Sequence, residues 1–152
     1  MSVTYAHEPF SSFVEELQAL LPEHYEELCV VKEYPLDPDW ATYARLEQAG
    51  ILPCVTARVD GKLVGYVIYM TQPHLHYRAC MTAFEDIYFL KKEYRLGRTG
   101  IRLFQYAEKV LKQLGVNRVV MGTKVHSDKS RLFEYLGYKM TDKVFTKLLN
   151  QE

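Results

Sequence analysis

Long apolar runs are missing from this sequence of 152 residues. No stretch approaches the roughly 20 consecutive apolar residues that a membrane-spanning helix needs, so we expect no membrane segment. The first residues do not place a basic segment before an apolar one, which is the pattern of a secretory leader. These two absences predict a cytoplasmic protein.

Cysteine is also scarce. The three cysteines, Cys29, Cys54 and Cys80, lie far apart, and an odd number of them argues against a disulfide framework. Their spacing does not match a metal site, and the pair His74 and His76 has no third ligand at a helpful distance in the sequence. We therefore predict no metal and expect reduced, buried thiols.

An overall excess of charge is absent, since 19 Lys and Arg balance 19 Asp and Glu. Without a basic stripe that carries interleaved aromatics, a nucleic-acid partner is disfavoured. The charge is nevertheless uneven. Residues 1–50 carry ten acids against Lys32 and Arg45, whereas residues 91–152 carry fourteen Lys and Arg against six acids. One region suits a cationic ligand and the other an anionic one, unless both are merely solvated faces.

The length and pattern predict one domain, residues 1–152, with an acidic helical region over 1–50 and a sheet-containing core over 51–152. A helical stripe predicts a first helix over residues 10–21, opened by a Ser12–Glu15 capping box and followed by Pro22. Asp37 or Asp39 is expected to cap another helix that ends near residue 47.

The core should begin with a hairpin over residues 51–70, because Asp60-Gly61 is a type I′ turn signal. The order that follows is a strand over 79–90, a helix over 99–114 and a strand over 117–123, which predicts a right-handed parallel βαβ unit. A short helix over 128–136 and a last strand over 138–149 complete the predicted elements.

The turn inside this unit reads YRLGRTGIRL, residues 94–103. Gly97 and Gly100 leave room for an anion to approach the backbone at the start of a helix, where N–H groups lack intrahelical partners. The spacing matches neither the dinucleotide fingerprint G-x-G-x-x-G nor the phosphate loop G-x-x-x-x-G-K-[ST]. The surrounding basic residues favour a phosphate-containing ligand of another kind.

Residues 90–121, LKKEYRLGRTGIRLFQYAEKVLKQLGVNRVVM, resemble motif A of the GNAT N-acetyltransferases. In the pattern [RQ]-x-x-G-x-[GA], Arg95 takes the first place and Gly100 the last. The likeness extends to the preceding hairpin, to NRVVMGT and to SRLFEYLGY, and the acidic N-terminal helices with LDPDW and PHLHYR resemble a phage-encoded branch, which would place the protein in the host cytoplasm. It implies an α/β fold of the GNAT type, with a mixed, mostly antiparallel central sheet, a parallel βαβ unit that binds acetyl-CoA, and helices on both faces.

The resemblance also implies acetyl-CoA as co-substrate and an amine acceptor beside the acidic region. The pyrophosphate would meet the backbone of residues 96–101, which we call the cradle. The pantetheine arm would pair with the preceding strand. Arg95, Arg98 and Lys129 would face the phosphates. The expected cofactor-binding residues are Tyr88, Phe89, Leu90, Arg95, Leu96, Gly97, Arg98, Thr99, Gly100, Ile101 and Lys129.

Two departures from the family pattern bear on chemistry. Arg98 stands where the family has its first glycine, so Gly97 shifts the turn or Arg98 folds over the phosphates. Phe133 stands where many members have a tyrosine that protonates the leaving thiolate, and phenylalanine has no proton to give.

Four residues are candidates for proton transfer. Asp86 is the first candidate base, because strand alternation gives it the facing of Tyr88 and Leu90. Glu85 is the second and should face the other way. His74 and His76 could relay protons near neutral pH, or be surface residues.

Three functions stay open. The first is an active acetyltransferase for a primary amine on a small molecule or a protein. The second is a non-catalytic GNAT module that binds coenzyme A or a protein, which Phe133 favours. The third is a toxin that acetylates charged tRNA, against which the acidic N-terminal region argues. A homodimer is common in the family, and the sequence leaves it open.

Overall fold

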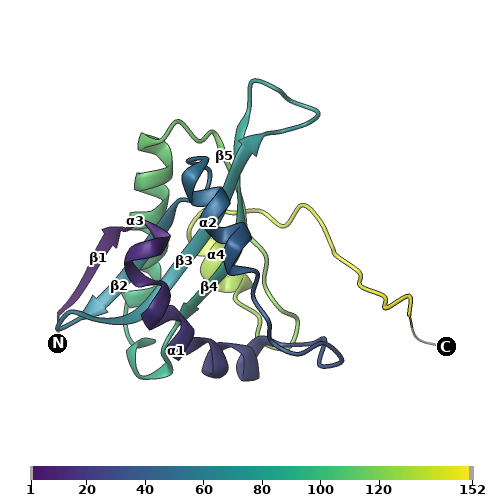
Figure 1. The fold of residues 1–152 in the computed structure, drawn as a ribbon. Coiled ribbons are helices and arrows are strands. Elements are labelled where there is room, and N and C mark those ends of the chain that lie inside the picture. Colours follow the sequence, from purple (N-terminus) through teal and green to yellow (C-terminus); the bar gives the residue numbers. More distant parts are fainter. Residues whose placement is uncertain (1, 151–152) are drawn as a thin grey trace.

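The computed structural model describes residues 2–150 as a sheet with helices on both faces (Figure 1). The strands are β1 (Val3–His7), β2 (Cys54–Val59), β3 (Lys62–Pro73), β4 (Met81–Leu90) and β5 (Arg118–Val120). They lie in the order β1-β2-β3-β4-β5, and all neighbours are antiparallel except β4 and β5, which are parallel. The predicted mixed α/β fold class is confirmed.

The hairpin of β2 and β3 turns at Asp60 and Gly61, as predicted. Both residues have positive φ, 51° and 78°, which a type I′ turn requires of its two central residues. Strand β1 was not predicted. It is only five residues long, and its partner β2 lies about fifty residues further along the chain, so no local sequence pattern predicts it.

Helix α1 (Phe10–Leu28) runs through Pro22 and does not end there, contrary to the prediction. Proline removes one backbone hydrogen bond and bends a helix, and the axis of α1 changes direction midway in Figure 1. Burial holds the two halves together, because Phe13, Leu17 and His24 all face the sheet. The predicted capping box is also wrong, since α1 begins at Phe10 and no side chain caps it.

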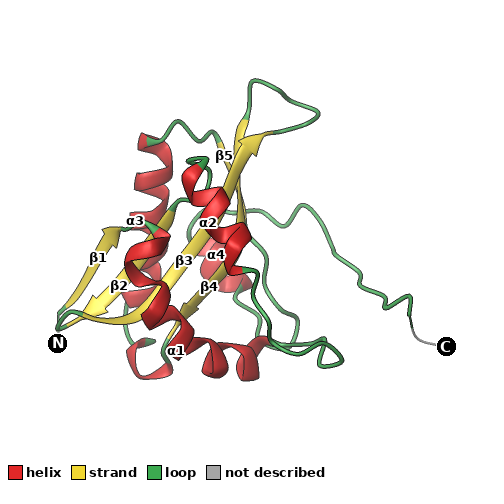
Figure 2. Cartoon of the chain, in the orientation of Figure 1, coloured by secondary structure: helices red, strands yellow, loops and turns green. Residues whose placement is uncertain are grey.

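Helix α2 (Trp40–Gln48) is capped by Asp39, whose carboxylate accepts a hydrogen bond from the Thr42 backbone at 3.0 Å. Helices α1 and α2 cover one face of the sheet (Figure 2). Their core contains Phe10, Phe13 and Leu17 packed on strand residues such as Tyr66 and Ile68. This face carries the acidic region of the chain.

The other face is covered by α3 (Thr99–Gln113) and α4 (Ser130–Tyr135). A second core lies beneath them, and its buried members are Val55, Ala57, Val59, Val64, Val67, Tyr69, Ala83, Leu90, Leu103, Phe104, Ala107, Val110, Leu111 and Phe133. The predicted helix over 99–114 is therefore observed almost to the residue. A short 3-10 turn, η1 (Lys92–Tyr94), links β4 to the cradle that precedes α3.

Strands β4 and β5 pair only over Thr82–Phe84 and Arg118–Val120. Beyond these residues the two strands diverge, so residues 85–90 of β4 have no strand neighbour on that side within residues 2–150. A sheet that opens in this way leaves backbone groups and side chains facing a gap rather than another strand.

The predicted last strand over 138–149 is wrong. Residues 139–150 form no regular element and extend away from the sheet (Figure 1). Strand formation needs a partner, and none of the described strands pairs with these residues, although β5 has a free edge. In the part of the chain that the structure describes, no helix is both long and apolar enough to cross a membrane.

Candidate functional site

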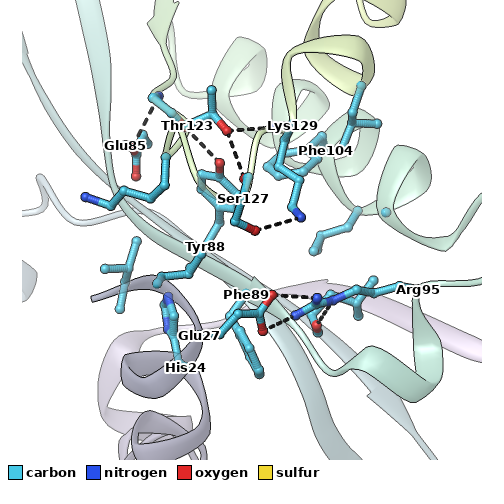
Figure 3. A pocket seen from close by; sticks show the side chains of 18 of the residues that line it. His24, Glu27, Glu85, Tyr88, Phe89, Arg95, Phe104, Thr123, Ser127 and Lys129 are labelled. Carbon is cyan, nitrogen blue, oxygen red and sulfur yellow. Dashed lines mark hydrogen bonds and ion pairs between the residues drawn. The ribbon is translucent and has the colours of Figure 1, made fainter. Parts of the chain in front are cut away.

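A cavity of about 680 Å³ fills the gap between β4 and β5 (Figure 3). It reaches α1 on one side of the sheet and α3 and α4 on the other. Its lining residues are His24, Glu27, Leu28, Glu85, Asp86, Ile87, Tyr88, Phe89, Leu90, Arg95, Gly97, Gly100, Ile101, Leu103, Phe104, Gly122, Thr123, Lys124, Ser127, Lys129, Leu132 and Val144. Most candidate residues from the sequence are therefore gathered around one cavity.

A β-bulge at Asp86 shapes the wall of this cavity. Ile68 pairs with Ile87 and Tyr69 pairs with Glu85, so Asp86 is the extra residue on β4. A bulge interrupts the alternation of side chains along a strand. Asp86 therefore faces α2 and not the side of Tyr88 and Leu90, which corrects the prediction from alternation.

The Asp86 carboxylate accepts a short hydrogen bond from the Tyr43 hydroxyl of α2. Burial raises the pKa of Asp86 above its ordinary value, and the bond from Tyr43 offsets part of that rise. The same bond and burial raise the pKa of Tyr43, so its proton stays on the phenol. The result is a carboxylate that is fixed in orientation and is more basic than an exposed aspartate.

Glu85 faces the opposite side of β4, where it spans the gap to β5. The backbone N–H of Gly122 donates to Glu85 Oε1 at 3.2 Å. Burial raises the pKa of Glu85 to about 7, although this hydrogen bond lowers it. A side chain at position 122 would crowd the carboxylate, because an added Cβ would lie 2.9 Å from Oε1.

His24 is a lining residue that sequence reasoning missed. Its imidazole Nδ1 lies 2.7 Å from the Tyr66 hydroxyl, and its ring stacks on Phe89 at 4.8 Å between centroids. Burial lowers the pKa of His24 to about 4, so the ring is neutral at neutral pH. Its spacing of seven residues from the buried Leu17 was the available signal, and Pro22 concealed it by suggesting an earlier end of the helix.

The Arg95 side chain is held by protein groups. Its guanidinium makes a bidentate pair with Glu27 at 2.6 and 2.7 Å, and Nε donates to the Leu90 carbonyl at 2.6 Å. The charged group also lies over the Phe89 ring. Arg95 thus fastens α1 to the end of β4, and its side chain is not the free phosphate ligand that the sequence suggested.

The cradle between η1 and α3 combines a left-handed glycine with an uncapped helix. Gly97 has φ 60°, whereas Arg98, the N-cap residue, has φ −105°. No side chain caps α3. In its first turn the Thr99 N–H donates to the Leu96 carbonyl and the Arg102 N–H to the Arg98 carbonyl, whereas Gly100 and Ile101 have no such acceptor within residues 2–150. Gly97, Gly100 and Ile101 line the cavity, which directs this end of the helix dipole into it.

Arg98 points away from the cavity. Its Nη1 donates to the Tyr135 hydroxyl at 3.2 Å, and the guanidinium lies 5.8 Å from the centroid of that ring. Of the two alternatives left open by the sequence, the left-handed Gly97 shapes the turn. Arg98 links the start of α3 to α4. Leu96 is mostly exposed beside them, at 73%.

Two further polar side chains lie on the α4 side of the gap in Figure 3. Lys129 Nζ donates to Ser127 Oγ at 3.2 Å and supplies a cation to the cavity. The Tyr88 hydroxyl donates to the Gly122 carbonyl at 2.8 Å, which places a phenol across the gap. Burial raises the pKa of Tyr88 to about 12.

The Tyr88 ring meets Phe104 and Phe133 edge to face, with centroids 5.4 and 5.8 Å away. Phe133 is buried, at 7% exposure, and belongs to the core. Phe133, which has no hydroxyl group, therefore packs against Tyr88, which has one.

His74 and His76 do not take part in this site. They lie between β3 and β4, where the backbone N–H of His76 donates to His74 Nδ1, and neither residue lines the cavity. The structure therefore gives no support to a proton relay through them, which stays a prediction. Within residues 2–150 no group of three or more His, Cys, Asp or Glu side chains is placed to hold a metal ion.

Comparison with known proteins adds a family to this geometry. The family model of the acetyltransferase (GNAT) family matches residues 13–138. No curated protein matches the chain.

Solved structures share the fold at low sequence identity. The ribosomal-protein-alanine N-acetyltransferase of Brucella melitensis biovar Abortus 2308 is 19% identical, with a TM-score of 0.75 over 99% of this chain and 100% of that chain. AAC(6')-Iy, solved in complex with the bisubstrate analogue CoA-S-monomethyl-acetylneamine, is 15% identical, with a TM-score of 0.74 and the same coverage. A Trypanosoma brucei acetyltransferase is 15% identical, with a TM-score of 0.72 over 97% of this chain and 100% of that chain.

The buried His24 predicts a stability that depends on pH. Because its folded pKa is near 4 and its unfolded pKa near 6.5, the unfolded chain binds more protons between these values. The free energy of unfolding should therefore fall as pH drops from 6.5 to 4, by up to about 3 kcal/mol from this group. Urea unfolding of wild type and His24→Phe at several pH values gives, for each protein, the slope of the free energy of unfolding against pH. Parallel slopes for the two proteins would contradict the assignment.

Proposed function

Because this chain belongs to the acetyltransferase (GNAT) family, we propose that it transfers an acetyl group from acetyl-CoA to a primary amine. The observation that carries the proposal is the uncapped start of α3, which faces a cavity between two diverging strands. An anionic, extended ligand fits this arrangement, because the helix start accepts phosphates and the open strand accepts an extended chain.

The cradle residues would hold the pyrophosphate of acetyl-CoA. N–H groups from Gly97 to Ile101 are the proposed donors, and the left-handed Gly97 lets the backbone turn toward the ligand. Lys124 and Lys129 line the same cavity and would add positive charge. Arg95 would contribute by fixing α1 and β4 rather than by touching phosphate.

The open side of β4 would hold the pantetheine arm. Residues 85–90 lack a strand neighbour there, so Tyr88, Phe89 and Leu90 offer backbone groups to an added extended segment. Acetyl-CoA would supply an activated acyl group at this point. The protein's task is then to position the amine, take up a proton and stabilise developing charge.

The α1–α2 side is the proposed entrance for the amine. This region carries the acidic excess of the sequence, which favours a cationic acceptor. Asp86 faces it and is held by Tyr43, so we assign Asp86 as the base that removes the ammonium proton. Glu85 is the second candidate, because its pKa of about 7 suits proton transfer near neutral pH.

The proton balance requires a donor as well as a base. The amine nitrogen bonds to the acyl carbon, the carbon–sulfur bond breaks, and the electron pair stays on sulfur. One proton leaves the ammonium before attack, a second leaves nitrogen as the amide forms, and one is taken up by sulfur. Phe133 cannot supply the last proton, whereas the Tyr88 hydroxyl lies across the gap and is protonated at neutral pH.

The second candidate function is a GNAT module that binds coenzyme A without turnover. Phe133 favours it, because the hydroxyl that many members carry there is missing. The two functions share the cradle and differ in whether the carboxylates and Tyr88 affect rate.

Acetyl-CoA binding tests the part common to both functions. We expect wild type to bind acetyl-CoA in isothermal titration calorimetry and Gly97→Ala to bind about tenfold more weakly, because a left-handed alanine costs roughly 1–2 kcal/mol. Gly97→Asn is the matched control and should bind nearly as wild type does, since asparagine tolerates this conformation. Wild type that fails to bind at high micromolar acetyl-CoA would exclude both functions.

Thiol release with a panel of primary amines tests catalysis. Asp86→Asn should lower kcat/KM by about 10²- to 10⁴-fold, as expected for loss of a general base. Tyr43→Phe removes the bond that lowers the pKa of Asp86, so the acid limb of the pH–rate profile should move to higher pH. A larger loss in Glu85→Gln than in Asp86→Asn would transfer the assignment to Glu85. Unchanged rates in both would leave neither carboxylate as the base.

Variants that remove or relocate one phenol hydroxyl group test the proposed role of Tyr88 as the proton donor. Tyr88→Phe should lower kcat at saturating acetyl-CoA by about tenfold or more, because the thiolate loses its proton donor. The double variant Tyr88→Phe/Phe133→Tyr restores a phenol from the adjacent ring and should recover part of kcat. Full activity in Tyr88→Phe, or a loss confined to KM, would show that Tyr88 only positions the ligand.

A further inference from the structure

The imidazole of His24 reaches the cavity from α1 (Figure 3). The residue is 7% exposed, so protein encloses almost all of it. Polar groups that are buried to this degree ordinarily have hydrogen-bond partners. The two ring nitrogens of His24 differ in this respect, because Nδ1 has a partner, whereas Nε2 has none within residues 2–150.

The partner of Nδ1 is the Tyr66 hydroxyl group, at 2.7 Å. Tyr66 lies on β3 and is fully buried, and within the described chain its hydroxyl group has no second hydrogen-bond partner. If Nδ1 carried the proton, the hydroxyl oxygen would accept it and the hydroxyl proton would stay unpaired in the core, which is costly. Nδ1 is therefore the acceptor, and Tyr66 donates.

This bond decides where the ring of His24 carries its proton. Burial keeps the pKa of His24 near 4, so the ring is neutral at pH 7 and has one N–H group. Because Nδ1 accepts, that group is Nε2–H. The ring is also held in place, since its face stacks on Phe89 and its Nδ1 edge is bound to Tyr66. His24 thus presents a fixed, uncharged N–H donor.

The Nε2–H group is open to the cavity. Among the side chains of residues 2–150, the enclosed nitrogen and oxygen atoms without a partner are the Tyr69 hydroxyl oxygen and Arg118 Nε. Nε2 of His24 also lacks a protein partner but is not enclosed as these two atoms are. The space that His24 borders is the large cavity. The donor therefore has room for an acceptor that belongs to a ligand.

The surroundings of His24 favour an uncharged acceptor. The ring lies against Phe89, and Leu28 follows one turn later on α1 and lines the same cavity. The lysines that line the cavity come from elsewhere, Lys124 from the loop after β5 and Lys129 from the N-cap of α4. A phosphate group gains more from these cations than from a neutral N–H group, whereas a carbonyl group suits a neutral donor.

The position of His24 along β4 separates it from both ends of the proposed ligand. Phe89, on which the ring stacks, follows Asp86 by three residues, or about 10 Å of strand. Phe89 also precedes the cradle, where the pyrophosphate would lie. A donor at this level faces the middle of an extended ligand. In acetyl-CoA the middle is the pantetheine arm, whose two amide carbonyls are neutral acceptors.

We propose that His24 donates from Nε2 to an amide carbonyl of the pantetheine arm and so favours ligands that carry this arm. The inference rests on the proposed function, since it takes coenzyme A as the ligand. It adds a side-chain contact from α1 to the backbone pairing along β4. His24 is then a binding residue, and Tyr66 is a positioning residue that acts by fixing the tautomer of His24.

Calorimetry with two ligands tests the contact. Coenzyme A carries the arm, whereas adenosine 3′-phosphate 5′-diphosphate keeps the pyrophosphate and lacks the arm. His24→Phe should bind coenzyme A about tenfold more weakly than wild type does, because an arm carbonyl loses its donor. It should bind the shorter compound as wild type does. Unchanged affinity for coenzyme A, or an equal loss for both compounds, overturns the inference.

Two further variants separate the contact from a structural effect. His24→Gln is the matched control, since its amide restores an N–H donor near the position of Nε2 and should recover most of the affinity for coenzyme A. His24→Phe leaves the Tyr66 hydroxyl group unpaired in the core, whereas His24→Phe/Tyr66→Phe removes both polar groups. The double variant should fold and show the same selective loss.

Nuclear magnetic resonance of wild type with nitrogen-15-labelled histidine reads the ring directly. We expect the proton on Nε2, and coenzyme A should shift the Nε2–H signal and slow its exchange with water, whereas the shorter compound should do neither. A proton on Nδ1, or a signal that coenzyme A leaves unchanged, overturns the inference and leaves the proposed function intact. Wild type that does not bind coenzyme A overturns the proposed function and this inference with it.

Discussion

The divergence of β4 from β5 is the constraint on which the rest of this molecule depends. Three residue pairs hold the two strands together, and then β5 leaves its neighbour. The cavity of the candidate site lies in the opening that this divergence produces. The divergence leaves the end of β4 unpaired, aims the start of α3 into a cavity, and lets side chains from opposite faces of the sheet meet in one space.

The helices on the two faces keep this opening from closing. On one side, the pair of Glu27 and Arg95 fastens α1 to the last residues of β4, and the neutral His24 fills the space between α1 and Phe89. On the other side, the aromatic contacts of Tyr88 with Phe104 and Phe133 brace the strand against α3 and α4. These contacts fix the position of β4 against the helices on both sides of the cavity.

Local patterns predicted the helices, the hairpin and the βαβ unit, because periodicity, the Asp60-Gly61 turn and the Asp39 cap act within a few residues. Gly97 was correctly named as the alternative centre of the turn. Apart from the Ser12–Glu15 capping box, the failures involve distant partners. Strand β1 depends on β2, the passage of α1 through Pro22 depends on burial of His24, and residues 139–150 pair with none of the described strands.

Glu85 and Asp86 show the same limit of prediction from local sequence. Alternation along β4 correctly separates Glu85 from Asp86, but the extra residue opposite Ile68 and Tyr69 reverses both assignments, so that Glu85 and not Asp86 shares the side of Tyr88. In this segment β4 behaves as two half-strands that are out of phase by one residue. Removal of Asp86 would restore regular alternation while each half kept its register with β3 and its present face, and the side of α2 would lose its carboxylate. The extra residue is thus what brings a carboxylate onto the face of the sheet that Ile87 and Phe89 share.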